Sequence, residues 1–501
     1  DQVGEHRGGY LPFTIDLTST VGDARTFDLR VHVRDITNTG YRSTGKQSLH
    51  PGGIWYSPHS GIWQTVWLES VPAIYVTGLT LRPLPDHASL EVVVRTSAPC
   101  QVQAEVGEPY PGEGQSLPGA PVASARLRSV SSSRGDYLAR LRLTIPGPHP
   151  WTPEDPYLYW LRIRAGDDTV TSYAAMRTIG LQRDAHGRLL IALNGRPYLQ
   201  AGVLDQGYWP DSGVTPPADD AMVADIQAMR AAGFTMLRKH VKIEPLRWYY
   251  HCDRLGMLVW QDMVNGGRTP GRRVSTSTTL TRLPLRDRWY RLFGRQDARG
   301  RTEFRSELAA TVALLTNSPS VVVWVLFNES WGQFDAALLT RLVRRLDPTR
   351  LIDHASGWYD QGAGDIRSLH VYGRPIQASG EWGRDGRPAV LTEYGGYSLR
   401  MPGQGAGFPE HGYRRATSPA QLTEAYRRLQ HDELLPAVRA GLAGYVYTQL
   451  ADVEGELNGL RTADRRYAKI APDVLARLNT ELRRAFEDDQ QARPASNHLP
   501  T

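Results

Sequence analysis

Two glutamates stand where paired carboxyl chemistry could be carried out. Glu329 follows the run Val-Val-Val-Trp-Val-Leu-Phe-Asn, which is too apolar to be half-exposed, and Glu393 ends the run Ala-Val-Leu-Thr-Glu. Each glutamate is therefore predicted to lie at the end of a buried strand. Two carboxyl groups about 5–5.5 Å apart can cleave a glycosidic bond with retention of configuration, one protonated to assist the leaving group and one ionised to attack the sugar. Either acid alone could be structural, so the evidence lies in the pair.

The elements that must position these acids begin near residue 183, where strands start to alternate with helices. About 300 residues with eight strands predict a (β/α)₈ barrel over residues 183–490, whose catalytic groups lie at the C-terminal ends of the strands. A doubly wound open sheet is the alternative, but no glycine-rich phosphate loop follows the first strand. The predicted strands are 198–204, 235–240, 258–262, 321–328, 351–355, 369–372, 389–393 and 444–449, and the predicted helices are 219–232, 245–255, 302–316, 335–346, 419–435 and 471–487.

The first part of the chain reads as β-structure without a long helix. Residues 71–182 contain short strands separated by turns rich in Pro and Gly, which predicts a β-sandwich of immunoglobulin-like size. Residues 1–70 are also predicted to be strand-rich, with strands at 10–17, 26–33 and 62–68. Asp1 enters strand-like sequence directly, without a starting Met or a signal peptide, so we expect an upstream part to be missing. Residues 491–501 are expected to form a C-terminal tail.

Composition narrows the class of protein. The net charge is +6, but 54 of the 58 basic residues are arginine, spread along the chain among 52 acids, which does not favour a nucleic-acid partner. The densest cluster, Arg268–Arg301, is interpreted as a solvated surface or as a rim contact to an anionic substrate or a neighbouring subunit. No apolar run approaches the roughly 20 residues that cross a bilayer. Cys100 and Cys252 fall in different predicted domains, so no disulfide is expected, which fits a reducing compartment. We expect a cytoplasmic protein; the missing start leaves secretion open.

The two glutamates also carry a family resemblance. Val-Leu-Phe-Asn328-Glu329-Ser-Trp resembles the acid/base signature of glycoside hydrolase family 2, and Leu-Thr-Glu393-Tyr-Gly-Gly is similar to the family's nucleophile strand. The resemblance implies a multidomain retaining exo-β-glycosidase with Glu329 as acid/base and Glu393 as nucleophile, and it identifies residues 1–70 as part of a sugar-binding jelly roll. Further matches in family order are Gly8–Phe13 and Ser60–Glu69 in the jelly roll, Asn194–Pro197 at the start of the barrel, Tyr249–Gly256 in its second helix, and Gly444–Gln449 with Asn458-Gly459 around its eighth strand.

The resemblance implies roles for further residues at matching positions. Asn328 is expected to bond the sugar 2-hydroxyl, Arg238 to hold the nucleophile ionised, and Tyr372 to donate to Glu393. The alternatives are an Asn that caps the loop and an Arg in a surface ion pair. Tyr447 is expected to form a platform under the sugar ring and Trp331 a wall on the leaving-group side, with plain packing as the alternative for both. The predicted substrate-binding set is Asn328, Arg238, His370, Tyr372, Tyr447, Trp331 and Asp262.

The sequence determines the identity of the sugar substrate less well than the catalytic residues. Asn458-Gly459-Leu460 lacks the lysine of glucuronidase-like members, Trp260-Gln261-Asp262 resembles the mannosidase branch, and Lys239-His240-Val241-Lys242 replaces the usual galactosidase-like sequence. The two lysines could meet an acidic or heavily hydroxylated sugar, or one could face a neighbouring helix. We hypothesise a neutral β-hexoside or pentoside, β-galactosidase-like first. The alternatives are β-mannosidase or β-glucuronidase specificity, a non-catalytic carbohydrate-binding homologue, or a transglycosylase.

The sequence predicts few cofactors and partners. His240, His354 and His370 end strands without the spacing of a metal-ligand motif, so no metal site and no cofactor are required. A bound divalent or monovalent cation near the barrel mouth is compatible with the resemblance. The expected partner is an oligosaccharide or glycoside substrate, without nucleic acid or membrane, and assembly into a homo-oligomer is allowed. In the free enzyme Glu329 should be protonated and Glu393 ionised, since the reaction needs one acid and one base.

Overall fold

The structure is a computed structural model that describes residues 2–132, 135–268, 285–377, 382, 386–405 and 407–491. Its centre is a sheet of eight strands in the order β16-β15-β14-β13-β12-β21-β18-β17. Every paired neighbour in this sheet is parallel. All eight predicted strands are confirmed: β12 (Gln200–Asp205), β13 (Met236–Lys239), β14 (Leu258–Asp262), β15 (Val321–Val325), β16 (Leu351–Asp353), β17 (Arg367–Val371), β18 (Ala389–Gly395) and β21 (Gly444–Thr448).

The sheet curves into a nearly closed barrel whose remaining seam lies between β16 and β17. Side chains bridge that seam, because Ser368 donates to the carboxylate of Asp353 and Ser356 Oγ lies 3.0 Å from Nε2 of His370. The strands are buried on both faces, as in a parallel barrel covered by helices; β15 (Val-Val-Val-Trp-Val) is buried throughout.

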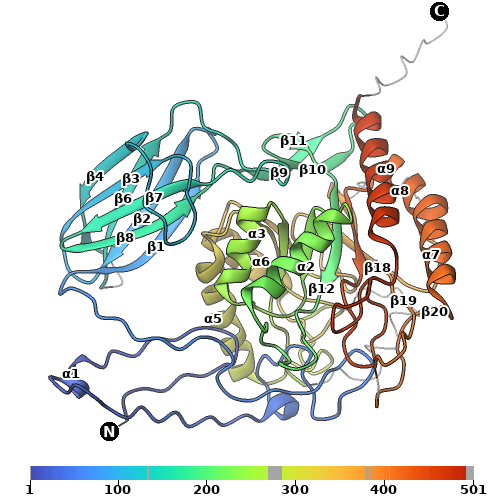
Figure 1. The fold of residues 1–501 in the computed structure, drawn as a ribbon, viewed down its shortest axis with the longest axis horizontal. Helices are drawn as coiled ribbons and strands as arrows, with labels where there is room; N and C mark the ends of the chain where they lie inside the picture. The colour runs from blue at the N-terminus through green and yellow to red at the C-terminus, as the bar shows by residue number, and fades with distance from the viewer. Residues whose placement is uncertain are drawn as a thin grey trace, which may run out of the picture.

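Helices follow the strands and cover the barrel, as Figure 1 shows. Asp297 caps α5, its side chain accepting from the N–H groups of Arg299 and Gly300. The predicted helix 419–435 is divided, because a π-helical segment, η2 (Leu429–Leu434), leads into α8, where Pro436 lacks a backbone N–H. The helices are α2 (Asp219–Ala231), α3 (Leu246–Leu255), α5 (Ala298–Leu315), α6 (Ala336–Leu346), α7 (Pro419–Arg428), α8 (Leu435–Arg439) and α9 (Pro472–Gln491).

Two antiparallel four-stranded sheets precede the barrel and enclose their own apolar core. Alternate residues of β6 are buried, the period-two pattern of a strand with one covered face. One sheet has the order β1 (Val76–Pro83), β2 (Ser89–Thr96), β6 (Tyr137–Thr144), β5 (Val130–Ser131), and the other β4 (Ala123–Arg128), β3 (Gln101–Gly107), β7 (Tyr159–Ala165), β8 (Asp168–Ala174). A small sheet of β9 (Ile179–Arg183), β10 (Leu189–Leu193) and β11 (Arg196–Pro197) leads into the barrel.

The strands predicted at 10–17, 26–33 and 62–68 were wrong. In the described part of residues 2–75 the regular elements are a short helix, α1 (Thr18–Val21), and a 3₁₀ turn, η1 (Thr37–Thr39). A strand requires a hydrogen-bonded neighbour, and these segments pair with no strand among the described residues. Their apolar side chains are accordingly exposed, Trp67 by 70% and Leu68 by 71%. Figure 1 shows this blue part of the chain as long loops.

Part of this N-terminal segment nevertheless packs against the barrel. The N–H groups of Thr44 and Gly45 donate to the carbonyl of Asn265 over 3.0 and 2.9 Å. Farther along, the N–H of Ser57 donates to Glu454 over 2.8 Å, and the hydroxyl of Tyr56 donates to Glu456. Residues 41–57, which we call the N-terminal wall, therefore lie against loops that follow strands β14 and β21.

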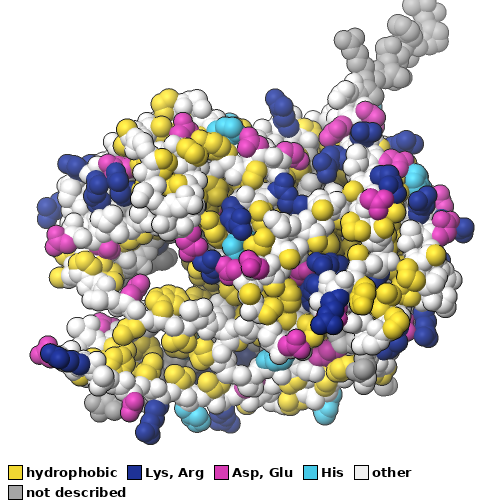
Figure 2. Space-filling model, in the orientation of Figure 1, with side chains coloured by type: hydrophobic (Ala, Val, Ile, Leu, Met, Phe, Trp, Pro, Cys, Tyr) yellow, Lys and Arg dark blue, Asp and Glu magenta, His cyan; other side chains and the backbone are white. Residues whose placement is uncertain are grey.

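The surface carries intermingled charges of both signs on the face drawn in Figure 2. Within the cluster 268–301, residues 269–284 lie outside the described part. The solvated-surface interpretation is wrong for Arg295, which is buried and donates to the carbonyls of Gly332 and Tyr41. Cys100 and Cys252 are both free and buried. None of the described helices combines the length and the hydropathy needed to cross a lipid bilayer.

Candidate active site

Glu329 and Glu393 reach the barrel mouth from opposite parts of the sheet. Glu393 lies on β18, and Tyr394 beside it packs outward against Tyr426 of the helical layer, so strand alternation turns Glu393 inward. Glu329 lies four residues beyond β15 with φ of 47°, followed by Ser330 with φ of 65°. Two consecutive non-glycine residues in the left-handed region cost about 1–3 kcal/mol each. Such strain is concentrated at functional sites, where the surrounding structure enforces it.

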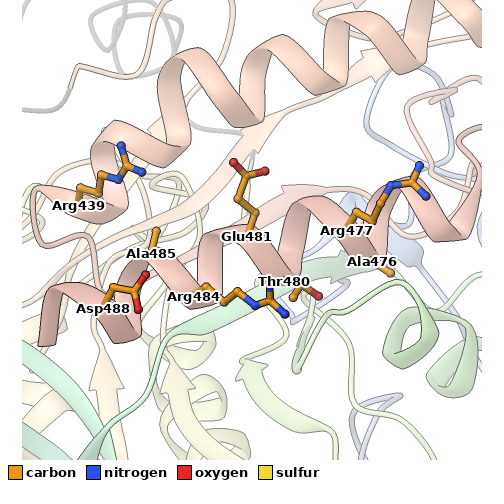
Figure 3. A pocket seen from close by; sticks show the side chains of 8 residues that line it. All are labelled: Arg439, Ala476, Arg477, Thr480, Glu481, Arg484, Ala485 and Asp488. Carbon is orange, nitrogen blue, oxygen red and sulfur yellow. The ribbon is translucent and has the colours of Figure 1, made fainter. Parts of the chain in front are cut away.

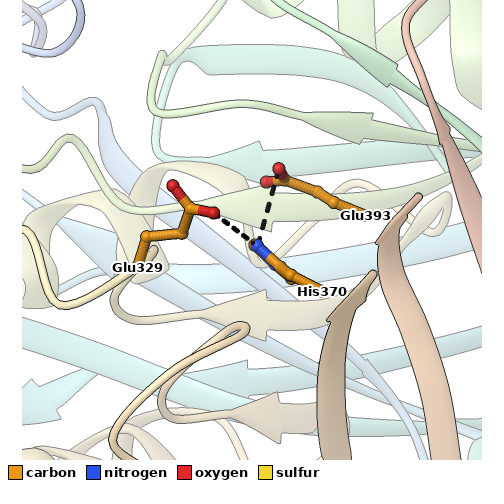
Figure 4. Close-up of side chains that lie close together, drawn as sticks. All are labelled: Glu329, His370 and Glu393. Carbon is orange, nitrogen blue, oxygen red and sulfur yellow. Dashed lines mark hydrogen bonds and ion pairs between the residues drawn. The ribbon is translucent and has the colours of Figure 1, made fainter. Parts of the chain in front are cut away.

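The two carboxyl groups meet. One oxygen of Glu329, one oxygen of Glu393 and one nitrogen of His370 all lie within 4.8 Å of one another, as Figure 4 illustrates. Both glutamates are buried, with 7% and 5% of their surface exposed. Retaining glycosidases hold their carboxyl groups about 5–5.5 Å apart, whereas inverting enzymes need about 6.5–9.5 Å to admit a water molecule. The separation therefore suits direct attack by one carboxylate.

His370 connects the pair. Its Nδ1 lies 2.8 Å from Oε1 of Glu329 and 3.6 Å from Oε2 of Glu393. Its Nε2 lies 3.0 Å from Oγ of Ser356, which donates onward to Thr392. These three groups could also coordinate a small cation, but the 2.8 Å contact is that of a direct hydrogen bond. The imidazole of His370 therefore lies between the two carboxyl groups and contacts both.

Arg238, on β13, holds Glu393 in place. Its Nη1 donates to Oε1 of Glu393 over 3.1 Å, while Nε and Nη2 form a fork to Asp262, each over 3.0 Å. Nη2 also donates to Oδ1 of Asn328 over 2.7 Å. Because the side chain is fully buried, it is not the surface ion pair of the alternative interpretation. Bidentate, charge-assisted bonds hold the guanidinium rigidly.

The surroundings of Glu393 favour its ionised form. Tyr372 donates to Oε2 of Glu393 over 2.7 Å and lies 2.7 Å from Oγ1 of Thr448. Burial by itself would raise the pKa of Glu393. The charges of His370 and Arg238, with the Tyr372 hydrogen bond, outweigh burial and lower this pKa to about 2. A carboxylate that stays ionised at neutral pH is suited to nucleophilic attack.

Asn328 presents a free donor at the same place. Its Oδ1 accepts from Arg238, and its backbone N–H donates to the side-chain oxygen of Asn265 over 3.0 Å. Its Nδ2 is buried and has no partner among the described residues. A buried amide without a partner costs about 1–3 kcal/mol, so a substrate oxygen at this point would be bound favourably. Asn328 therefore does not act as the loop cap of the alternative interpretation.

Trp331 and Tyr447 occupy very different places. Trp331 packs at a ring distance of 5.0 Å from Trp55 of the N-terminal wall and 6.2 Å from His240, at the edge of the site. Tyr447 is 1% exposed and packs against Tyr394 and Tyr426, on the helical side of β21. The structure does not bring Tyr447 to the carboxyl pair. Its neighbour Thr448 faces the site instead.

Lys239 and Lys242 belong to an internal ionic network. Lys239 lies 2.6 Å from Asp205 and 2.9 Å from Glu244, and Lys242 lies 2.8 Å from Glu244. Lys242 also donates to two backbone carbonyls. Because neighbouring acids already neutralise these buried ammonium groups, they support the barrel instead of meeting a sugar.

Several residues near the pair were not predicted from the sequence. His240 Nδ1 lies 2.7 Å from Asp262, and burial lowers the pKa of His240 far below its usual range. Thr448 could have been found from strand alternation once Tyr447 was considered. Nothing in the sequence pointed to three residues of the N-terminal wall, Lys46, Trp55 and Tyr56, except that lysine is rare in this chain.

A separate groove of about 590 Å³ lies on α8 and α9, and its lining includes both positive arginines and negative acids (Figure 3). It contains none of the predicted site residues. Its side chains form ordinary surface pairs, such as Arg477 with Asp473 over 2.7 Å. The groove gives no reason to move the site away from the barrel mouth.

Curated relatives of this chain are β-galactosidases. A β-galactosidase from Psychromonas ingrahamii is 26% identical over 404 residues, covering 74% of this chain and 36% of that protein. A β-galactosidase from Klebsiella pneumoniae is 27% identical over 368 residues, covering 67% of this chain and 32% of that protein. The chain thus spans about a third of the length of these curated relatives.

Solved structures share the fold. A β-galacturonidase from Eisenbergiella tayi, bound to galacturonate, superposes with a TM-score of 0.62 at 16% identity, covering 85% of this chain and 75% of that chain. A β-glucuronidase from Faecalibacterium prausnitzii superposes with a TM-score of 0.58 at 22% identity, covering 82% and 66%. The family model described as glycosyl hydrolases family 2, TIM barrel domain, matches residues 187–466, more than half of the chain. The chain therefore belongs to glycosyl hydrolase family 2.

Proposed function

We propose that this protein is a retaining exo-β-glycosidase that removes terminal β-linked sugars. The observation that carries the proposal is the approach of Glu329 and Glu393, with carboxyl oxygens within 4.8 Å across the barrel mouth. That separation is closer to the value of about 5–5.5 Å in retaining enzymes than to the roughly 6.5–9.5 Å of inverting ones. The asymmetry of their partners supports different roles for the two acids.

In the proposed reaction Glu393 attacks the anomeric carbon while Glu329 protonates the departing oxygen. The product of this step is a covalent glycosyl ester on Glu393. Glu329 then removes a proton from water, which attacks the same carbon and releases the sugar with Glu393 again ionised. Arg238 and Tyr372 keep Glu393 charged between turnovers through one hydrogen bond each.

Other side chains are assigned to substrate binding. The free Nδ2 of Asn328 would donate to the sugar 2-hydroxyl, a bond that strengthens as positive charge grows on the ring. His370 would pass a proton to and from Glu329, and Asp262 would hold Arg238 in place. Trp331 with Trp55 would form an aromatic wall. Tyr447 is assigned to packing.

The sugar and the finer domain assignments belong to the proposal as well. The curated relatives are called β-galactosidases, so a β-galactoside is the first substrate to test. Residues 71–182 are interpreted as an immunoglobulin-like β-sandwich, because their two antiparallel sheets pack around one core. From the sequence matches at Gly8–Phe13 and Ser60–Glu69 alone, residues 1–70 are interpreted as part of a jelly roll, although their described residues form no paired sheet. Residues 183–490 are interpreted as the catalytic barrel.

The test is azide rescue of a Glu393→Gly variant. Hydrolysis of a p-nitrophenyl β-galactoside should disappear, and azide should restore turnover while forming the α-glycosyl azide, because azide enters the space vacated by the nucleophile. Arg428→Gly, at an exposed position on α7, is a control for handling and folding. Unchanged hydrolysis in Glu393→Gly would exclude this mechanism, and sugar binding without turnover in the unmodified protein would favour a carbohydrate-binding homologue.

A further inference from the structure

Lys46 is a largely buried cation without an anionic partner among the described residues. The chain has four lysines, and the other three all pair with carboxylates: Lys239 and Lys242 with Glu244, and Lys469 with Asp452 over 2.6 Å. Lys46 is equally buried, with 4% of its surface exposed. It forms no ion pair or hydrogen bond through its ammonium group with any described residue.

Two aromatic rings lie against this ammonium group. Its Nζ lies 4.8 Å from the ring centre of Trp331 and 5.7 Å from that of Tyr56. The backbone is fixed as well, because the N–H of Tyr56 donates to the carbonyl of Lys46 over 2.9 Å. The hydroxyl of Tyr56 in turn donates to Glu456 of the barrel. The position of Lys46 is therefore held at both its backbone and its charged end.

That position is at the edge of the site, on the side of Trp331 and His240. Trp331 follows Glu329 by two residues, and its ring centre lies 6.2 Å from that of His240. After burial, the charge of Lys46 is the largest influence that lowers the pKa of His240. His240 itself bonds Asp262, the partner of Arg238. Lys46 thus adds a positive charge from the N-terminal wall to the rim of the site.

An ammonium group at the end of a largely buried side chain loses part of its hydration, and cation–π contacts recover only part of that loss. An anion entering the site would complete its surroundings. A lysine ammonium is a compact point charge that suits a single anionic group. A dianion such as a phosphate would also meet the negative charge of Glu393, which disfavours it relative to a monoanion.

We propose that Lys46 binds the carboxylate of a uronic acid held beside Glu329 and Glu393, so that the preferred substrate is a terminal β-uronoside. This inference rests on the proposed glycosidase function and names its substrate class. The same ammonium group could bind a sulfate ester on a neutral sugar, which shares the monoanionic chemistry. Lys46 acts here on specificity, while the bond-breaking groups remain the two glutamates.

The test compares matched sugars on the full chain and on Lys46→Met, which keeps the length of the side chain and its packing against Trp331. With p-nitrophenyl β-galacturonide, β-galactoside and 6-sulfo-β-galactoside, we expect the intact protein to prefer the uronide. In Lys46→Met the ratio of kcat/KM for uronide over galactoside should fall by about 100-fold. Lys46→Arg should retain part of the preference, and Arg428→Met is the matched charge-loss control on the surface.

Binding provides a second readout that does not depend on turnover. Calorimetric titration should show that galacturonic acid binds more tightly than galactose. In Lys46→Met this difference in affinity should disappear, while the melting temperature of the protein stays unchanged. Equal losses for acidic and neutral sugars, preference for the neutral sugar, or preference for the sulfated sugar alone would overturn the proposal. If no glycoside is turned over but the acid still binds through Lys46, the glycosidase proposal fails and the uronate site stands.

Discussion

Arg238 donates from Nη1 to Oε1 of Glu393 over 3.1 Å, and both side chains are buried. The guanidinium does not move freely, since its other nitrogens are engaged by Asp262 and Asn328. The charge on Glu393, the proposed nucleophile, is therefore stabilised by a cation whose own position is fixed. This relationship predicts how the pH dependence of activity should respond to substitution.

Arg238→Lys should reduce kcat/KM by about 100-fold or more, because lysine cannot reproduce the fork to Asp262 and the bond to Glu393 together. The pKa of Glu393 is lowered to about 2 with Arg238 present, so weakening that contact should raise it. Activity requires the ionised form and is lost as the pH falls through this pKa. The acidic limb of the kcat/KM profile should therefore move to higher pH, and an unmoved limb would contradict the assigned role.

Tyr372→Phe should lower kcat and also shift the acidic limb upward, because Glu393 loses a 2.7 Å hydrogen bond that favours its ionised form. Tyr413 offers a matched comparison, since its ring stacks on that of Tyr372 at 3.8 Å and it forms no described hydrogen bond to Glu393. In the pH profiles of activity, the acidic limb should lie at higher pH for Tyr372→Phe than for Tyr413→Phe. Identical shifts in both variants would indicate a packing effect alone.

Glu329→Gln should separate the two steps of the reaction. A 2,4-dinitrophenyl leaving group needs little protonation, so its release should persist as a rapid burst, while a glycoside with a poor leaving group should be cleaved about 10²–10⁴-fold more slowly. Deglycosylation should also be slow and should be accelerated by azide, giving the β-glycosyl azide. An α-azide product, as expected for Glu393→Gly, would mean that the two roles are reversed.

The barrel could be predicted from the sequence because its strands are buried on both faces. Runs such as residues 321–327 are continuously apolar and buried, and a glutamate that follows such a run is expected at the barrel mouth. The same local patterns were misleading for residues 10–17 and 62–68. There the side chains suit a strand, but pairing depends on a neighbour, which local sequence does not reveal.

The site was predictable in part for similar reasons. Arg238, His370 and Tyr372 lie at strand ends, where the barrel brings them to Glu393. Tyr447 was placed on the wrong side, although alternation from the inward Thr448 would have corrected it. Lys46 could not be found, because its approach to Trp331 depends on how the N-terminal wall packs against the barrel.

The junction between the β-sandwich and the barrel yields a prediction about stability. Asp253 of α3 accepts from the backbone N–H of Ser320 over 2.8 Å and from the hydroxyl of Tyr173 on β8 over 2.6 Å. Burial raises the pKa of Asp253 to about 6 from an ordinary 3.8, although both hydrogen bonds oppose the rise. The folded state therefore binds more protons than the unfolded state between these two values, and stability falls as the pH rises through that window.

Asp253→Asn removes this penalty while keeping an acceptor for Ser320. A difference of about two pKa units corresponds to roughly 3 kcal/mol, an upper value because Tyr173 then meets an amide. The melting temperature of the variant should exceed that of the unmodified protein at pH 8 and approach it at pH 4, as measured by scanning calorimetry. Asp473→Asn, at an exposed position on α9, controls for the loss of one charge. Equal destabilisation of Asp253→Asn at both pH values would show that Asp253 is ionised in the fold and that the carboxylate itself stabilises the junction.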